Sequence, residues 1–168
     1  MQSLLTLEPV DRTRRNHGLE HATIHLLSQK VRGVSIVGRS TPSGFYLYGS
    51  VSTEAVGAAA SEALQRMQAG EAGLAIHPNC GTNFVTAGVA TSLAAWLGFI
   101  GANNWRARWG RLPVVALLSV AALVAAQPLG LALQQHVTTS GQPGALEIVG
   151  ITRTQRGKLT THFVETRH

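Results

Sequence analysis

The sequence predicts an α+β membrane protein, in which a small antiparallel sheet with two helices is interrupted by a two-helix transmembrane hairpin. Three observations predict this class. Two amphipathic helical patterns and four short segments rich in β-branched or aromatic residues indicate the α+β part, and two long uncharged apolar runs separate them. We therefore expect a first part of an α+β metal-site domain (1–83), a transmembrane helical hairpin (84–136) and a C-terminal β-hairpin that completes the domain (137–168).

The composition favours a membrane and argues against nucleic acid. Charged residues make up 13% of the chain and apolar residues 45%, although the net charge is +6. The arginines cluster at 12–15 and 106–111, without the aromatic interleaving or the helix-turn-helix pattern of a nucleic-acid interface. Anionic lipid headgroups explain them more simply. We expect the lipid bilayer as a partner and no nucleic acid.

The first helix is predicted from about Arg14 to Val31, with Asp11 or Asn16 as its N-cap and Gly33 after its end. Its apolar positions supply packing against the rest of the domain. Its polar side carries a motif.

That motif occupies residues 17–25, which read His-Gly-Leu-Glu-His-Ala-Thr-Ile-His. In a helix, residues three and four apart share a face, so His17, Glu20 and His21 project together, and His25 follows one turn later. Two imidazoles at this spacing can bind one Zn²⁺, and a carboxylate beside them can accept a proton from water at the metal. His-x-x-Glu-His is the inverzincin motif. Taken alone, it is equally compatible with an amphipathic helix whose histidines are solvated or hydrogen-bonded, which is the interpretation we favour for His25.

The segments 34–39 and 44–51 flank a turn that contains proline, and they predict a β-hairpin. Ser52 or Thr53 then caps a second helix, which Gly70 ends.

A tight turn follows, and it presents His77 and Cys80 three residues apart. His-x-x-Cys in a turn is a suitable two-ligand clip for a borderline-soft ion such as Zn²⁺. With this second feature, we expect one Zn²⁺ per chain. Because Cys80 is the only cysteine, an intrachain disulfide is excluded.

The apolar runs 84–102 and 113–133 are long enough, at 1.5 Å per residue, to cross a hydrocarbon core of roughly 30 Å. Trp96, Trp105 and Trp109 favour this interpretation over a buried soluble hairpin, because tryptophan collects at the headgroup level. The arginines between the runs place the connector in the cytoplasm, but a basic N-terminal domain without a signal peptide argues for the reverse. The membrane side of the domain is left open.

The last predicted strands, 146–153 and 159–165, are joined by a turn at 155–158. This second hairpin is expected to complete a sheet with the first, because an isolated two-stranded hairpin is barely stable.

The two motifs together resemble an uncharacterised bacterial family of multi-spanning membrane proteins catalogued as candidate metal-dependent enzymes. In that family His-Gly-x-Glu-His is followed by His-Pro-x-Cys-Gly-Thr, which leads into a membrane helix. The rest of the sequence and the number of membrane helices differ from the family. The resemblance implies a protein of the bacterial cell membrane with a metal site of five residues and four that shape it: His17, Glu20, His21, His77 and Cys80, and Gly18, Pro78, Gly81 and Thr82.

The number of metal ligands decides the function. If His17, His21 and one of His77 or Cys80 bind the metal, a position stays open for water. Glu20 can then act as general base in a zinc metallohydrolase.

Because the site directly precedes the first apolar run, its leading substrate is a membrane protein or peptide, and a lipid-linked ester or amide is second. We therefore expect a metalloprotease that cleaves peptide bonds in or near the membrane. If His77 and Cys80 both bind the metal, the site is closed, and the chain is a non-catalytic membrane adaptor with a structural zinc. A homo-oligomer is compatible with both alternatives.

Overall fold

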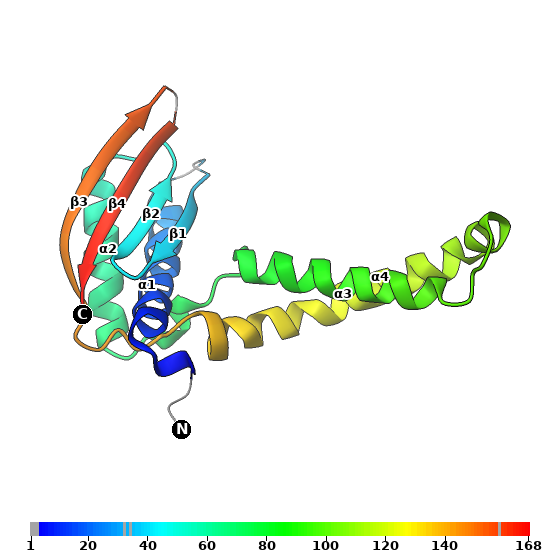
Figure 1. Cartoon of the computed structure of the whole chain (residues 1–168). Coiled ribbons are helices and arrows are strands. Elements are labelled where there is room, and N and C mark those ends of the chain that lie inside the picture. Colours follow the sequence, from blue (N-terminus) through cyan, green and yellow to red (C-terminus); the bar gives the residue numbers. More distant parts are fainter. Residues whose placement is uncertain (1–3, 32, 34, 158) are drawn as a thin grey trace. The chain divides into compact units, whose positions relative to one another are not determined.

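The structure is a computed structural model that describes residues 4–31, 33, 35–157 and 159–168. It divides into two compact units, an α+β domain (Met1–His77 with Gln135–His168) and a helical hairpin (Pro78–Gln134) (Figure 1). The α+β class and the small antiparallel sheet are confirmed. The two units are treated separately below.

Helix α1 (Glu8–Lys30) begins earlier than predicted, with Leu7 as its N-cap. Proline in the first turn and the acidic Glu8 and Asp11 suit a helix N-terminus, because proline lacks the N–H that would be unpaired there and carboxylates favour the positive end of the dipole. Neither Asp11 nor Asn16 is the cap. Asn16 is instead buried within α1, where its side chain donates to the carbonyl of Thr41 (2.9 Å).

Four strands form one sheet in the order β1-β2-β4-β3, and every neighbouring pair is antiparallel. The prediction that the C-terminal hairpin joins the first hairpin is therefore confirmed. The strand bounds differ from the predicted ones, and residues 34 and 158 lie outside the described residues. The observed strands are β1 (Val37–Thr41), β2 (Gly44–Tyr48), β3 (Glu147–Arg156) and β4 (Leu159–Arg167).

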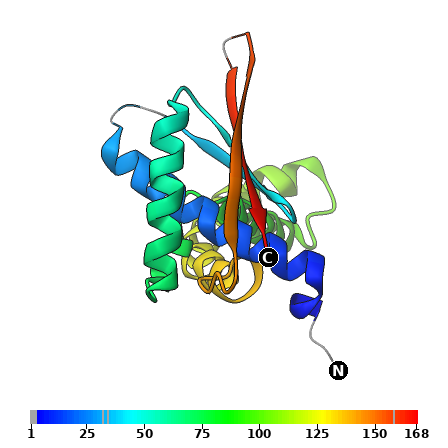
Figure 2. The same cartoon turned by 90° about the vertical axis from the view of Figure 1, so that its left-hand side faces the viewer.

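The β3–β4 hairpin extends beyond the shorter β1–β2 hairpin (Figures 1 and 2). Helix α2 (Thr53–Gln68) is capped by the predicted Ser52, whose hydroxyl accepts from the amide of Ala55 (3.1 Å). Half of its six buried residues are alanines, which lets it pack closely on α1.

One core lies between the two helices and one face of the sheet. Because side chains alternate along a strand, Phe45 and Leu47 of β2 and Val164 of β4 point into the core. Tyr46 and Phe163 lie on the opposite face, with their rings 4.6 Å apart. Helix α1 is thus packed in the domain from Asn16 to Leu27, which fixes the direction of the polar side chains in this part of the helix.

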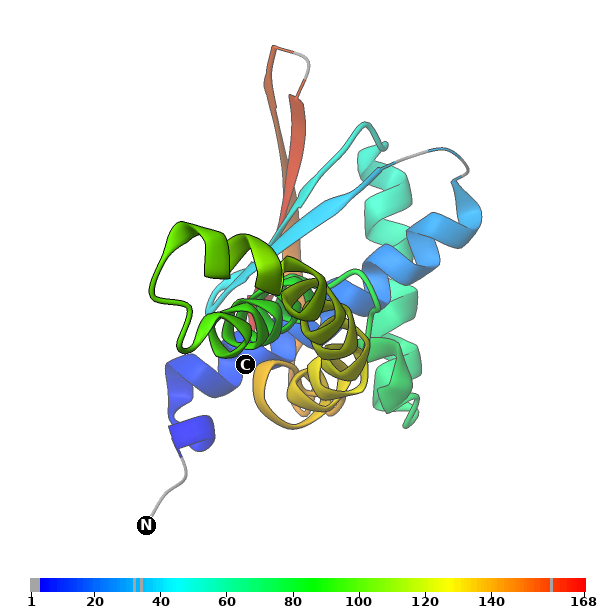
Figure 3. The same ribbon diagram turned by 90° about the vertical axis from the view of Figure 1, so that its right-hand side faces the viewer.

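The second unit contains α3 (Gly81–Phe99) and α4 (Trp105–Leu133), joined by a short turn that stands in the foreground of Figure 3. The predicted connector was too long, since Trp105 to Leu112 is already helical. The side chain of Asn104 caps α4 by accepting from the amide of Ala107 (2.8 Å). Arg111 donates to the carbonyls of Gly98 and Ile100 at the end of α3, so this arginine also closes the turn.

The two-span prediction is supported for one helix. Among the described residues, the continuous helical segment Trp105–Thr138 has 34 residues, and its most apolar stretch of 18 residues has a mean hydropathy of 2.1, so it is long and apolar enough to cross a membrane. A core helix of a soluble protein meets the same criterion. Helix α3, with 19 residues, does not meet the criterion.

Candidate metal centre

Three of the predicted site histidines lie together in the α+β domain. The rings of His17 and His21 on α1 have centroids 4.4 Å apart, and those of His21 and His77 are 5.9 Å apart. With Zn–N bonds of about 2.0–2.1 Å and tetrahedral angles, two imidazoles on one zinc have centroids roughly 5 Å apart. The histidines therefore lie at spacings that differ from a zinc site by less than an ångström each.

Main-chain carbonyls orient the two helix histidines. His17 Nδ1 lies 2.9 Å from the carbonyl oxygen of Thr138, and His21 Nδ1 lies 2.7 Å from that of Ala75. A carbonyl can only accept a hydrogen bond, so each Nδ1 carries the proton and donates it. In the neutral ring, Nε2 then presents its lone pair, which is the form that binds a metal.

The Glu20 side chain lies against strand β1, with 4% of its surface exposed. It accepts a hydrogen bond from the hydroxyl of Ser40, and it occupies the space that a Cβ at Gly38 would need. Burial raises the pKa of the Glu20 carboxyl, against the opposing effects of the Ser40 hydrogen bond and the His17 charge. Contacts with Ser40 and Gly38 of β1 thus fix the carboxylate, which belongs to the same helix as His17 and His21.

His77 is half-buried just before the helical hairpin. Its pKa is lowered by burial, and then by the nearby charges of His21 and His25. Both effects favour the neutral imidazole of His77, which is the form that binds a metal. His25 itself is exposed and lies 2.9 Å from the side-chain amide of Gln29, in agreement with a hydrogen-bonding role.

Cys80 belongs to the helical hairpin, where it is the N-cap residue of α3 and its thiol lies 3.6 Å from the hydroxyl of Thr82. It follows His77 by three residues, so the chain allows at most about 10 Å between their Cα atoms. Its place in a metal site therefore rests on the sequence spacing.

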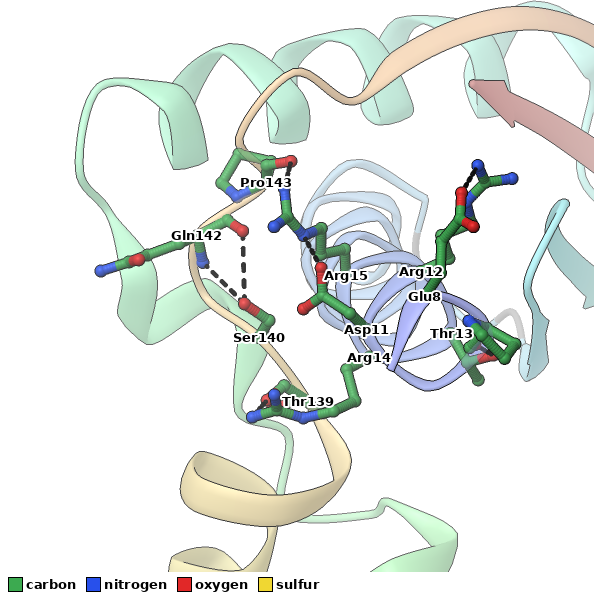
Figure 4. Close-up of polar contacts among 11 residues, drawn as sticks. Glu8, Asp11, Arg12, Thr13, Arg14, Arg15, Thr139, Ser140, Gln142 and Pro143 are labelled. Carbon is green, nitrogen blue, oxygen red and sulfur yellow. Dashed lines mark hydrogen bonds and ion pairs between the residues drawn. The ribbon is translucent and has the colours of Figure 1, made fainter. Parts of the chain in front are cut away.

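Sequence reasoning missed the residues that hold the carbonyls in place. Arg14 donates through Nε to the carbonyl of Val137 (2.7 Å) and through a terminal nitrogen to that of Thr139 (3.1 Å), on either side of the residue that orients His17. Figure 4 shows Arg14 beside Thr139. Gly18 is required because a Cβ there would lie 2.1 Å from the carbonyl oxygen of Ser140. The glycines at 18 and 38 were the available signals, since a glycine inside a helix or strand often marks close approach.

The fold and the site define an α+β protein whose first helix carries two histidines, His17 and His21, that main-chain carbonyls orient. In sequence, an apolar helical hairpin separates the two segments of its α+β domain. The chain belongs to the family described as Domain of unknown function (DUF6391), which matches residues 12–151. It is 33% identical over 167 residues to an uncharacterized protein of Picosynechococcus sp. (strain ATCC 27264 / PCC 7002 / PR-6), covering 92% of this chain and 78% of the relative. No solved structure matches the chain. Neither description mentions a metal or a peptidase.

Proposed function

We propose that this chain is an integral membrane zinc-dependent hydrolase, with His17, His21 and His77 as metal ligands and Glu20 as general base. One observation carries the proposal: both helix histidines are anchored at Nδ1 by main-chain carbonyls beside a third imidazole. Imidazole ligands suit zinc among the common biological metals.

When bound, zinc would supply a Lewis acid that polarises a carbonyl group and lowers the pKa of water. The rest of the chemistry falls to Glu20. Its carboxylate would accept the proton of the attacking water and return it to the leaving amine, so that one water is consumed for each peptide bond broken. Ser40 and Gly38 hold this carboxylate in one orientation.

A membrane-anchored substrate follows from the apolar helix. Only 17% of the most apolar part of Trp105–Thr138 is buried, which supports surroundings of lipid rather than protein. A second crossing by α3 is part of this proposal, because a short turn joins α3 to α4. We propose a peptide bond in or near a bacterial membrane as the target, with either membrane side possible.

Metal content tests the site. The full chain, purified in detergent, is expected to carry one zinc by elemental mass spectrometry, to lose it in His21→Ala and to keep it in His25→Ala. His25 is the matched control because it lies one turn further along the same helix and is exposed. Wild-type protein without zinc, or equal loss in both variants, would remove the metal from the proposal.

Turnover tests the reaction. Hydrolysis of a library of membrane peptides in ¹⁸O water should place one labelled oxygen in each new carboxylate. Glu20→Gln should keep its zinc and lower turnover by about 10²–10⁴-fold. Normal turnover by Glu20→Gln would exclude this residue as the base.

The alternative is a closed structural site in a membrane adaptor, and the His-x-x-Cys spacing favours it. Cys80→Ser separates the two functions. A site with three histidine ligands keeps its zinc in this variant, whereas a clamp that needs the thiolate releases it and loses the fold of the surrounding domain.

A further inference from the structure

A polar cavity of about 470 Å³ lies within the α+β domain. Arg14 and Arg15 of α1 form one wall, and the segment 139–142 before β3 forms another. Figure 4 shows both arginine side chains reaching from α1 toward this segment. Ala75, whose carbonyl accepts from Nδ1 of His21, also lines the cavity. The proposed hydrolase does not use it.

The wall of this cavity carries a net positive charge. Arg15 pairs with Asp11, with 2.8 Å between Nε and Oδ2. Arg14 donates hydrogen bonds to the main-chain carbonyls of His136, Val137 and Thr139. A carbonyl accepts an N–H but carries no full charge, so it does not neutralise the guanidinium. Within the described part of the chain, Asp11 is the only carboxylate that lines the cavity.

The position of the cavity along the chain indicates the source of an anion. The apolar segment Trp105–Thr138 ends here, and Gln135 and Thr139 at its end line the cavity. If this segment crosses a membrane, its end lies at the depth of the lipid headgroups, where arginines meet phosphate. The guanidinium group matches the geometry of a phosphate, and the volume is that of a small-molecule site.

We propose that this cavity binds a phosphate group, supplied by the headgroup of an anionic phospholipid at the end of the membrane span. Arg14 and Arg15 provide the charge, and the hydroxyl of Ser140 lies in the same wall. The ligand would connect α1 to the segment that leaves the membrane.

Gly73 allows a test that leaves every arginine contact in place. It lines the cavity, and a Cβ added at this position meets no atom within 4 Å. Gly73→Glu places a carboxylate in the cavity, and Gly73→Gln is its neutral control of the same shape. Arg12→Gln is a second control, because Arg12 pairs with Glu8 and does not line the cavity.

The full chain is purified in a zwitterionic detergent and mixed with equal amounts of phosphatidylglycerol and phosphatidylcholine with identical acyl chains. Native mass spectrometry should show phosphatidylglycerol retained about tenfold over phosphatidylcholine by the wild type, Gly73→Gln and Arg12→Gln. Gly73→Glu should abolish this preference. The measurement does not depend on zinc or on turnover, so its failure would leave the proposed hydrolase untouched.

Two results would overturn the proposal. The first is a lack of selectivity: either the wild type retains phosphatidylglycerol and phosphatidylcholine equally, or Gly73→Glu and Gly73→Gln retain phosphatidylglycerol to the same extent. The second is displacement of phosphatidylglycerol by millimolar inorganic phosphate but not by phosphatidylcholine, which would define a site for soluble phosphate instead of a lipid.

Discussion

The two units of this chain place their large apolar side chains in opposite ways. In the α+β domain, leucines and phenylalanine fill a core between two helices and a sheet, and Leu27 is completely buried. In the helical hairpin, glycines allow the two helices to approach each other closely. A Cβ at Gly98 would lie 2.7 Å from Val115, and one at Gly130 would lie 2.5 Å from Asn83. The large side chains point outward, and 72% of the Leu117 surface is exposed.

Two solvents, water around the α+β domain and lipid around the hairpin, would produce this difference, and they are what the proposed membrane location requires. Burial of apolar surface stabilises a domain in water, where it is the main favourable contribution to folding. Helices in lipid gain little from that effect, and they associate through close packing of small residues and through polar pairs such as Gln134 with Asn83 (2.7 Å). A surface of outward leucines marks a region that interacts with a membrane or with another protein.

The same substitution should therefore have unequal effects in the two units. Leu27→Ala is expected to lower the free energy of unfolding of the α+β domain by about 2–5 kcal/mol, because it leaves a cavity in the core. Leu117→Ala should cost less than about 0.5 kcal/mol in detergent micelles. The three tryptophans all lie in the hairpin and both tyrosines in the α+β domain, so their separate signals follow the two unfolding transitions in urea. Equal costs would remove the distinction between the units.

Glycine substitutions test the hairpin contact. Gly98→Val should destabilise the hairpin by about 1–3 kcal/mol, because the added side chain overlaps Val115. Gly88→Val on the same helix is the control, since a Cβ at Gly88 meets no atom within 4 Å. Tryptophan fluorescence during thermal unfolding measures both variants. If both variants unfold at the wild-type temperature, the two helices do not depend on this close approach.

Most elements of both units could be predicted from the sequence, because their signals are local. Periodic apolar residues revealed α1 and α2, and Ser52 marked a helix start. The predicted bounds of the helices were less accurate where a loop signal and a helix signal occurred in the same segment. The arginines before Pro113 suggested a loop, whereas Asn104 caps a helix that already includes them.

The candidate site was predicted in part. Helix periodicity brings His17 and His21 to one face of α1, as the motif predicted. The approach of His77 to His21 is a tertiary contact, and the sequence indicated it only by pairing a second metal-ligand motif with the first. The carbonyls of Ala75 and Thr138 could not be predicted, because any residue supplies a carbonyl and their positions depend on tertiary contacts far along the chain.

A buried histidine gives the α+β domain a pH dependence that the hairpin lacks. His162 of β4 is buried near Thr53, Glu54 and Arg153, and its pKa lies below the usual 6.5 because of burial and then the Arg153 charge, which outweigh the Glu54 charge. Below pH 6.5 the unfolded chain binds the proton more readily than the folded domain, so stability falls as the pH drops through the window between the two pKa values.

His162→Gln should remove that part of the pH dependence. The difference in unfolding free energy between wild type and variant is measured at several pH values from 5 to 7.5, followed by the tyrosine signal. The difference cancels the contribution of His77, whose pKa is also lowered. The tryptophan signal should show no change, since residues 78–134 contain no acidic residue or histidine. A constant difference across this range would contradict the prediction.

The smallest expected effect concerns the helix caps, and here the two units should agree. Ser52→Ala removes the bond to the amide of Ala55, and Asn104→Ala removes the bond to the amide of Ala107. Each should cost about 1 kcal/mol, measured by urea unfolding with the tyrosine signal for the first and the tryptophan signal for the second. Both caps lie at helix ends rather than in a core, so the cost reflects one local hydrogen bond in either solvent. A much larger cost at Asn104 would mean that its turn lies deeper in an apolar medium, where an unpaired amide is more expensive, and would extend the difference between the units to their turns.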